Sequence, residues 1–391
     1  MVKASAILTA AGLLIPLLAE ERTVWNVEVV DRAGSGNYNS LRLDKQGNAH
    51  LAYVAEQGDQ HSLRYAFWDR ALRRWFVMPV SNWASFSSLT LDSNQKPHIS
   101  FADYGTGSGA KLRHARWDGT SWKITPLPLD SETIGYYTSI ALDPEDKPNI
   151  SFYEYDGRRG TNHRVRMRVV SWNGKYWEVK TVDQENQSGK FNSIAIDSQS
   201  RLHLAYANVG ATTAGLRYAI REGGNWRSEI IEDLALANET VGQAVFITLD
   251  KHGNPHIVYS NSSRALVKYA FRKDDKWVTQ TVDQIDGIAY PDRYSMVLAE
   301  DQTPYISYFD PGAGVLKVAS RQGSQWVIEV VDQGGVGFTS SLEIHDGQIW
   351  VAYADGVNGA TKVARRTLTG KAAAPPSTSS SAQATSVQGT P

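Results

Sequence analysis

Histidine and aspartate, residues often used for metal binding and acid–base chemistry, recur in this chain at a fixed spacing. Four histidines fill one position of a segment that returns about every fifty residues, namely His50, His98, His203 and His256. A metal would need several of them within about 2.0–2.6 Å of one ion. Equivalent positions of successive repeats do not converge on one point, and other repeats place Asn149, Tyr305 and Trp350 there. We therefore predict that the histidines pack, and we assign no metal and no cofactor.

The repeated aspartates predict turns. Each follows an alternating apolar run of the repeat, at Asp44, Asp92, Asp143, Asp197 and Asp250. An aspartate in this position accepts hydrogen bonds from backbone N–H groups two residues further on, which makes an Asx turn. Catalysis by these carboxylates is not expected.

A cation occurs in the third strand-like run of all seven repeats, at Arg64, Arg113, Arg166, Arg217, Lys268, Lys317 and Lys362. An acidic or amide residue ends the second run of six repeats, at Asp103, Glu154, Asn208, Asn261, Asp310 and Asp355. Only Ala55 departs from this series. One interpretation is a pair within each repeat, which contributes a few tenths to about 1 kcal/mol. The alternative is a polar rim for a ligand, but occurrence in every repeat favours the structural interpretation.

A site for an asymmetric ligand needs residues that break the repeat. Trp83 is such a residue, because the other eleven of the twelve tryptophans have a place in the repeat. Aromatic rings stack on sugars, carboxylates accept sugar hydroxyls, and arginines bind carboxylate or sulfate. The alternative is that these residues form no ligand site and belong to an ordinary surface loop with solvated arginines. We predict a ligand site formed by Trp83, Asp103, Tyr104, Tyr136, Glu154, Tyr155, Arg158 and Arg159.

Two long loops, 232–243 and 283–294, carry a second set of polar residues: Glu232, Asp233, Glu239, Asp283, Asp286 and Asp292. Two carboxylates roughly 5–9.5 Å apart can hydrolyse a glycosidic bond. Spacing along the sequence does not test that distance, so no catalytic residue is assigned.

These residues stand on a repeated segment that begins as NYNSLRLDKQGNAHLAY at 37–53. It returns at 85–101, 136–152, 190–206 and 243–259, and in diverged form at 292–308 and 338–353. Each repeat has four strand-like runs separated by polar turns, and no stretch has a helical period. Four short antiparallel strands repeated seven times predict an all-β fold, a seven-bladed β-propeller.

The order of the strands follows from side-chain size. Runs rich in serine suit the crowded centre, and runs that begin with tryptophan suit the wide rim. The first tryptophan run, at 25–30, precedes any inner strand. We therefore predict that this N-terminal strand completes the last blade, three strands plus one, because an open ring would leave an unpaired sheet edge.

The pattern Y-x-S-L-x-L-D-x-x-G-x-P-H-I-S-Y, followed by L-[RK]-Y-A, resembles that of bacterial exported repeat propellers. Those are distant relatives of the sialidase-type, Asp-box propellers. The likeness covers residues 24–366 and implies the fold, but such propellers serve as lectins, adhesins, scaffolds, lyases and hydrolases. Here D-x-x-G-x-x-H stands where the Asp box has S-x-D-x-G-x-x-W, so no sialidase residue is assigned.

Composition narrows the function further. The formal net charge is −1 and cysteine is absent, which argues against nucleic acid as a partner and excludes disulfides and thiolate chemistry. Residues 1–19 hold Lys3 and an apolar run too short to span a bilayer, so we predict a signal peptide, with an uncleaved anchor as the alternative. Residues 369–391 are small, polar and proline-rich and predict a disordered tail. The propeller is then expected over residues 20–368.

We therefore expect a secreted or periplasmic protein, not inserted in the membrane after signal cleavage. No nucleophile–base pair or phosphate-binding loop is visible in the sequence. The prediction is a non-catalytic binding or scaffold propeller with a glycan or a protein as partner. The alternative is a polysaccharide lyase or glycoside hydrolase that acts on the same face.

Overall fold

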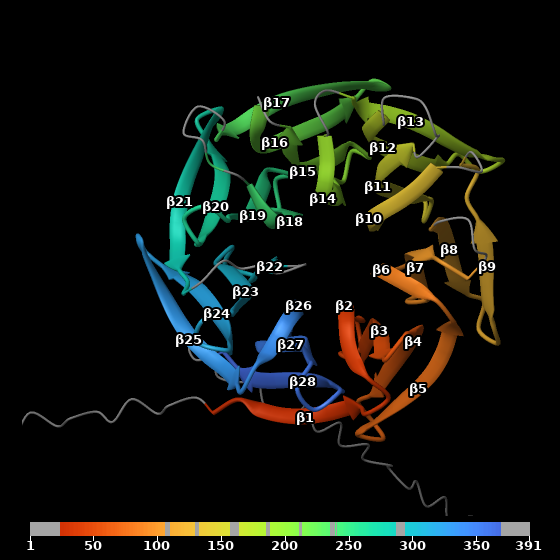
Figure 1. The fold of residues 1–391 in the computed structure, drawn as a ribbon, viewed down its shortest axis with the longest axis vertical. Coiled ribbons are helices and arrows are strands. Elements are labelled where there is room, and N and C mark those ends of the chain that lie inside the picture. Colours follow the sequence, from red (N-terminus) through yellow and green to blue (C-terminus); the bar gives the residue numbers. More distant parts are fainter. Residues whose placement is uncertain are drawn as a thin grey trace, which may run out of the picture.

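A computed structural model of the chain describes residues 24–105, 110–129, 133–156, 164–184, 188–210, 213–234, 239, 241–286 and 294–368. The expected signal peptide and C-terminal tail, as well as Arg158, Arg159 and Asp292, lie outside the described residues. Seven four-stranded antiparallel sheets surround a central axis as the blades of a β-propeller (Figure 1). The predicted fold class is confirmed.

Each blade runs from an inner strand at the axis to an outer strand at the rim. The inner strands are β2 (Ser35–Leu43), β6 (Ala84–Leu91), β10 (Thr133–Leu142), β14 (Ser188–Ile196), β18 (Val241–Leu249), β22 (Ser295–Leu298) and β26 (Val336–His345). The second strands are β3 (Ala49–Gln57), β7 (Pro97–Asp103), β11 (Pro148–Asp156), β15 (Leu202–Gly210), β19 (Pro255–Asn261), β23 (Pro304–Asp310) and β27 (Gln348–Asp355).

The third strands are β4 (Gln60–Asp69), β8 (Lys111–Trp117), β12 (Arg164–Trp172), β16 (Thr213–Glu222), β20 (Leu266–Lys273), β24 (Val315–Gln322) and β28 (Ala360–Thr367). The outer strands are β5 (Arg74–Ser81), β9 (Trp122–Pro126), β13 (Trp177–Asp183), β17 (Asn225–Asp233), β21 (Lys276–Gln284), β25 (Gln325–Gln333) and β1 (Asn26–Asp31). Blades 1 to 7 are numbered by their inner strands in chain order, so blade 1 is β2–β5 and blade 7 is β26–β28 with β1.

The N-terminal strand closes the ring as predicted. β1 pairs antiparallel with β28, with Asn26 opposite Arg365 and Val29 opposite Lys362. In Figure 1 the first and last coloured segments lie in one sheet. Blade 7 therefore takes strands from both ends of the described chain, and no blade lacks its outer strand.

The inner serines join the blades and do not merely fit the crowded centre. The hydroxyl oxygens of five of them accept a hydrogen bond from a backbone N–H of the next blade, for example from Leu89 to Ser40 at 3.0 Å and from Leu41 to Ser341 at 2.9 Å. Ser88, Ser139 and Ser295 accept equivalent bonds from Ile140, Ile194 and Leu342. A backbone donor buried between two sheets needs such a partner.

The outer tryptophans cover the aromatic residues of the preceding blade. Trp122 packs edge-on against Tyr65 with ring centroids 5.3 Å apart, and Trp277 packs in the same way against Tyr218 at 5.2 Å. The core is thus a series of similar apolar layers between blades. Among the described residues, no helix is long and apolar enough to cross a membrane.

The repeated histidines and aspartates have the predicted structural roles. Asp44 Oδ1 accepts hydrogen bonds from the N–H groups of Gln46 at 2.9 Å and Asn48 at 2.8 Å, as an Asx turn does. These bonds and His50 hold the pKa of Asp44 at about 2, against the opposing effect of burial, which is the largest single influence and raises it. His50 is buried, with Nδ1 2.6 Å from the hydroxyl of Tyr65. No group of three or more described His, Asp or Glu residues is arranged to hold a metal ion.

Candidate functional site

A carboxylate, a tyrosine and a cation join neighbouring blades at five of the seven seams. At the first, Asp31 of blade 7 accepts hydrogen bonds from the Tyr53 hydroxyl at 2.6 Å and from Arg64 Nη1 at 2.9 Å, both of blade 1. Burial, followed by the bond to Asp31, raises the pKa of Tyr53. We call this arrangement the seam triad. The other four are Asp183–Tyr206–Arg217, Glu232–Tyr259–Lys268, Asp283–Tyr308–Lys317 and Asp332–Tyr353–Lys362.

The cation series is therefore structural, but its pairing differs from the prediction. Pairs within one blade occur as expected at Arg113–Asp103, Arg166–Glu154, Lys317–Asp310 and Lys362–Asp355. In each seam triad the cation contacts a carboxylate of the preceding blade. Lys317 and Lys362 make this contact in addition to the pair within their own blade. This pairing between blades is not visible in the sequence because the carboxylate and the cation stand in different repeats.

Three of the carboxylates in the acidic loops bind groups of the protein. Glu232 and Asp283 belong to seam triads. Glu239 accepts a hydrogen bond from Asn261 at 2.6 Å and pairs with Arg264. Glu232, Asp283 and Glu239 thus hold loops and blades together.

The seam triad is missing where blade 1 meets blade 2 and where blade 2 meets blade 3. Ser81 and Pro128 stand in place of the carboxylate, and the tyrosine is replaced by the buried Phe101 and Phe152. The two changes occur together because a buried hydroxyl without an acceptor is costly. This is the part of the ring in which the sequence places the ligand site.

At the first of these seams an exposed tryptophan lies beside an open cleft. Trp83 N–H bonds to the carbonyl of His61 at 2.8 Å, as the N–H groups of Leu234 and Ile285 bond to Ala214 and Ala265 in other blades. Leu234 and Ile285 are buried, whereas 48% of Trp83 is exposed. Trp83 also has φ +78°, which is strained for a bulky residue. The fold does not require an exposed ring in this position.

The cleft has a volume of about 400 Å³ and is lined by Tyr38, Glu56, Asp59, His61, Trp83, Ala84, Ser85, Phe86 and Tyr104. A second hollow of about 240 Å³ is lined by Gln60, His61, Ser62, Asn82 and Trp83. Trp83 thus separates two hollows. The lining residues come from the loops that join outer to inner strands and second to third strands, and from the strand ends beside these loops. We call this side of the ring the upper face.

Aromatic rings continue from the cleft along the upper face. The rings of Tyr104 and Tyr136 lie 6.4 Å apart between centroids, and Phe86 contacts Tyr136 edge-on at 5.7 Å. Below them Tyr38, Phe86, Tyr137 and Phe191 form an arc over four successive blades, with neighbouring centroids 4.5–4.7 Å apart. All four have φ between +50° and +54° and lie at β-bulges, which re-aim side chains.

The structure brings only part of the predicted site together. Trp83 and Tyr104 line one cleft, Tyr136 lies beside Tyr104, and Tyr155 is close enough to help raise the pKa of Tyr136, after burial as the main cause. The two predicted acids, Asp103 and Glu154, already bind groups of the protein. Asp103 accepts hydrogen bonds from Gly105 N–H at 2.9 Å and Arg113 at 3.1 Å.

Glu154 is buried, with 3% of its surface exposed, and binds Arg166 and Arg168. Its carboxylate therefore faces the guanidinium groups of its own blade. Glu56, Asp59 and His61 were not predicted, since they stand at the hairpin between β3 and β4, which has an ordinary surface composition. The one indication of this site is that Trp83 is exposed, whereas Leu234 and Ile285 in the equivalent positions are buried.

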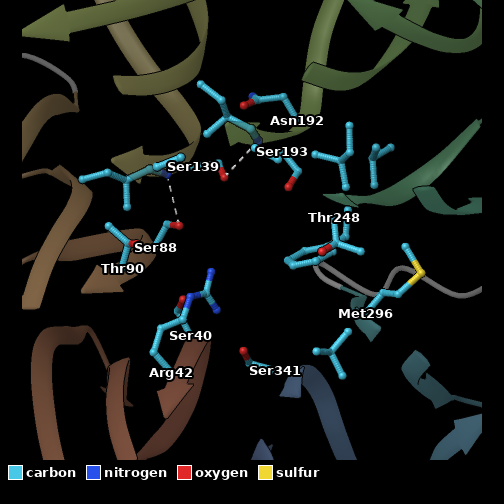
Figure 2. Close-up of a pocket in the computed structure, with 18 of the residues that line it drawn as sticks. Ser40, Arg42, Ser88, Thr90, Ser139, Asn192, Ser193, Thr248, Met296 and Ser341 are labelled. Atoms are coloured by element: carbon cyan, nitrogen blue, oxygen red, sulfur yellow. Dashed lines mark hydrogen bonds between the residues drawn. The ribbon is translucent and has the colours of Figure 1, made fainter. Parts of the chain in front are cut away.

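A separate cavity of about 270 Å³ lies on the propeller axis. Figure 2 shows Ser40, Ser88, Ser139, Ser193 and Ser341 around it, with the side chain of Arg42 among them. Arg42 pairs with Glu343 at 3.0 Å, and burial raises the pKa of Glu343. Most of these serines already accept bonds between blades, so we interpret this channel as the inner seam of the ring.

Comparisons with known proteins agree with this architecture. No protein-family model and no curated protein matches the sequence. Among solved structures, an ulvan lyase of polysaccharide lyase family PL25, bound to -[GlcA(1-4)Rha3S]-, is 12% identical, with TM-score 0.58 over 86% of this chain and 94% of its own. Hadza microbial sialidase Hz136 is 10% identical, with TM-score 0.52 over 82% and 76%. A protein of unknown function from Dyadobacter fermentans is 10% identical, with TM-score 0.53 over 88% and 99%.

The shared feature is the fold. The expected resemblance to sialidase-type propellers is confirmed at this level. At 10–12% identity no residue of those enzymes is transferred to this chain.

Proposed function

We propose that this chain is an exported propeller that binds a glycan in the cleft between blades 1 and 2. The observation that carries the proposal is Trp83, which is 48% exposed, in a strained backbone conformation, and flanked by hollows on the upper face. An aromatic ring beside a few polar groups is a common way to hold a sugar, because the ring stacks on the apolar face of the pyranose. Tyr104 and Tyr136 extend this surface toward blade 3.

The solved structures with similar folds support the same class of ligand. They include polysaccharide lyases, a sialidase and a mutant of the Aleuria aurantia lectin in complex with α-methyl-L-fucoside. Export is proposed from the apolar segment at residues 4–18, and a protein partner on the envelope remains the alternative ligand. N-terminal sequencing of the native protein tests export, with a mature start near Glu20 expected and an intact Met1 in a membrane fraction contradicting it.

The binding proposal is tested on a glycan array with the wild type and Trp83→Ala. We expect at least one class of glycan to bind, and Trp83→Ala to weaken that binding strongly. The matched control is Tyr176→Ala, since Tyr176 is 55% exposed but lies in a turn between a third and an outer strand on the opposite face. A wild-type protein that binds no glycan, or equal binding by Trp83→Ala, would contradict the proposal.

A second candidate function, polysaccharide lyase or glycoside hydrolase, is favoured by one pair in the cleft. His61 Nδ1 lies 3.3 Å from Glu56 Oε1, and both residues line the cleft with Trp83. An imidazole held by a carboxylate can act as a general base. Release of reducing ends or unsaturated products from a polysaccharide panel, lost in His61→Ala, would establish this activity over simple binding.

A further inference from the structure

The charge of the cleft distinguishes between classes of sugar. Its described lining contains two carboxylates, Glu56 and Asp59, and neither lysine nor arginine. The nearby arginines are already compensated, because Arg64 pairs with Asp31 and Arg113 with Asp103. His61 also lines the cleft, but even when protonated it can offset only one of the two carboxylates, so the described cleft presents net negative charge to whatever enters it.

The aromatic walls have the same preference. Tyr38, Phe86, Trp83 and Tyr104 line the cleft together with the two acids. The face of an aromatic ring attracts a cation, with tryptophan the strongest. Negative charge and aromatic faces both favour a cationic group and disfavour a uronate or a sulfate ester.

Glu56 is held in place for such a contact. Its carboxylate accepts a hydrogen bond from Asn37 Nδ2 at 2.5 Å and lies 3.3 Å from His61 Nδ1, and its side chain remains 25% exposed. Asp59 is at the exposed turn between β3 and β4. Glu56 is thus held in the wall of the cleft, and Asp59 lies at the entrance of the cleft.

We propose that the cleft binds a glycan that carries protonated amino groups, namely one with unacetylated amino sugars. This inference rests on the proposed glycan-binding function and names its substrate class. The amine would lie between Glu56 and the aromatic faces, and the sugar ring would stack on Trp83. It is opposite in sign to the ligand expected from Arg158 and Arg159, which lie outside the described residues.

The test compares three oligosaccharides of equal length by calorimetry at about pH 6, where an amine is largely protonated. They are a glucosamine tetramer, its N-acetylated form and a glucose tetramer with the same linkage. We expect the wild type to bind the glucosamine tetramer about tenfold more tightly than either neutral tetramer. The double variant Glu56→Gln/Asp59→Asn should bind all three equally.

The control variant Asp346→Asn removes an acid whose side chain is 67% exposed on the opposite face, and it should keep the preference for the amine. Thermal unfolding is used to check that the double variant remains folded. If it does not, the single variants Glu56→Gln and Asp59→Asn are measured instead. Equal affinity for charged and neutral tetramers, or tighter binding of a glucuronate- or sulfate-bearing oligosaccharide, overturns this inference while glycan binding stands. Failure of every oligosaccharide to bind overturns the proposed function itself.

Discussion

The hydroxyl of Tyr53 in blade 1 donates a 2.6 Å hydrogen bond to Asp31, which ends the outer strand of blade 7. The same contact recurs at four other seams, and where the carboxylate is replaced by Ser81 or Pro128 the tyrosine is a phenylalanine. The chain thus contains its own comparison between seams with and without the triad. The two seams that lack the triad lie on either side of blade 2, and Trp83 lies in the loop between blades 1 and 2.

Tyr53→Phe should lower the free energy of unfolding by about 1.5–3 kcal/mol, the usual contribution of a hydrogen bond to a charged group. Urea unfolding measures the change. Phe101→Tyr should also destabilise, because its hydroxyl would find no carboxylate, and Phe101→Tyr combined with Ser81→Asp should recover part of the loss. Additive effects of these two substitutions would contradict the structural coupling between the positions.

Deletion of residues 20–32 should destabilise the entire ring. It removes β1, exposes the edge of β28 and takes away the acceptor of Tyr53 and Arg64. We expect a lower unfolding temperature in a single transition, and a greater tendency to aggregate. A deletion of the tail from residue 371 is the matched control and should leave the unfolding temperature unchanged. An unchanged unfolding temperature after the N-terminal deletion would contradict closure by β1.

Stability should fall as the pH is lowered from about 6.5 toward 4. Burial holds the pKa of His98 at about 4 and that of His114 at about 3, against 6.5 for both in the unfolded chain. Between these values the unfolded state binds more protons, so the free energy of unfolding decreases as the pH falls, by at most about 1.4 kcal/mol per pH unit for each histidine.

His114→Tyr is the variant that tests this dependence. His114 Nε2 lies 3.2 Å from His98 Nδ1 in blade 2. In blades 1 and 4 the residue in the place of His114 is a tyrosine, and the hydroxyls of Tyr65 and Tyr218 contact the equivalent histidines His50 and His203. The tyrosine should fit the layer and reduce the slope of stability against pH. Urea unfolding at several pH values measures the slope, and an unchanged slope would show that His114 does not titrate between the two states.

The fold could be predicted from the sequence because propeller contacts repeat. A strand with Ser40 or Trp75 at a set position recurs at the same spacing, so each copy supports the others, including the offset that places β1 in blade 7. The candidate site could be predicted only in part. Trp83 and Tyr104 stand out as departures, but the engagement of Glu154 by Arg166 and Arg168 depends on side-chain directions within one blade.

Glu56 and His61 could not have been predicted, because nothing in their sequence distinguishes them from solvated loop residues. They line the cleft only because the hairpin between β3 and β4 lies against the loop that carries Trp83, a contact fixed by the bond from Trp83 N–H to the His61 carbonyl. The seam triads were missed for a similar reason, since Asp31 and Tyr53 belong to different blades. Contacts between repeats are not visible in the pattern of a single repeat.

The strain at Trp83 predicts that binding and stability can be separated. At φ +78° a side chain costs of order 1–3 kcal/mol, and the equivalent position in blade 6 is Gly334, with φ +100° and the same type of backbone hydrogen bond. Trp83→Gly removes the strain together with the stacking ring, whereas Trp83→Ala removes only the ring. We therefore expect Trp83→Gly to be more stable than Trp83→Ala by about 1 kcal/mol and at least as stable as the wild type.

Both variants should lose about 1–3 kcal/mol of glycan binding, as expected for an aromatic anchor. Urea unfolding and calorimetric titration measure the two quantities separately. If Trp83→Gly were much less stable than the wild type, Trp83 would be serving the fold and would not be the ligand anchor that we propose.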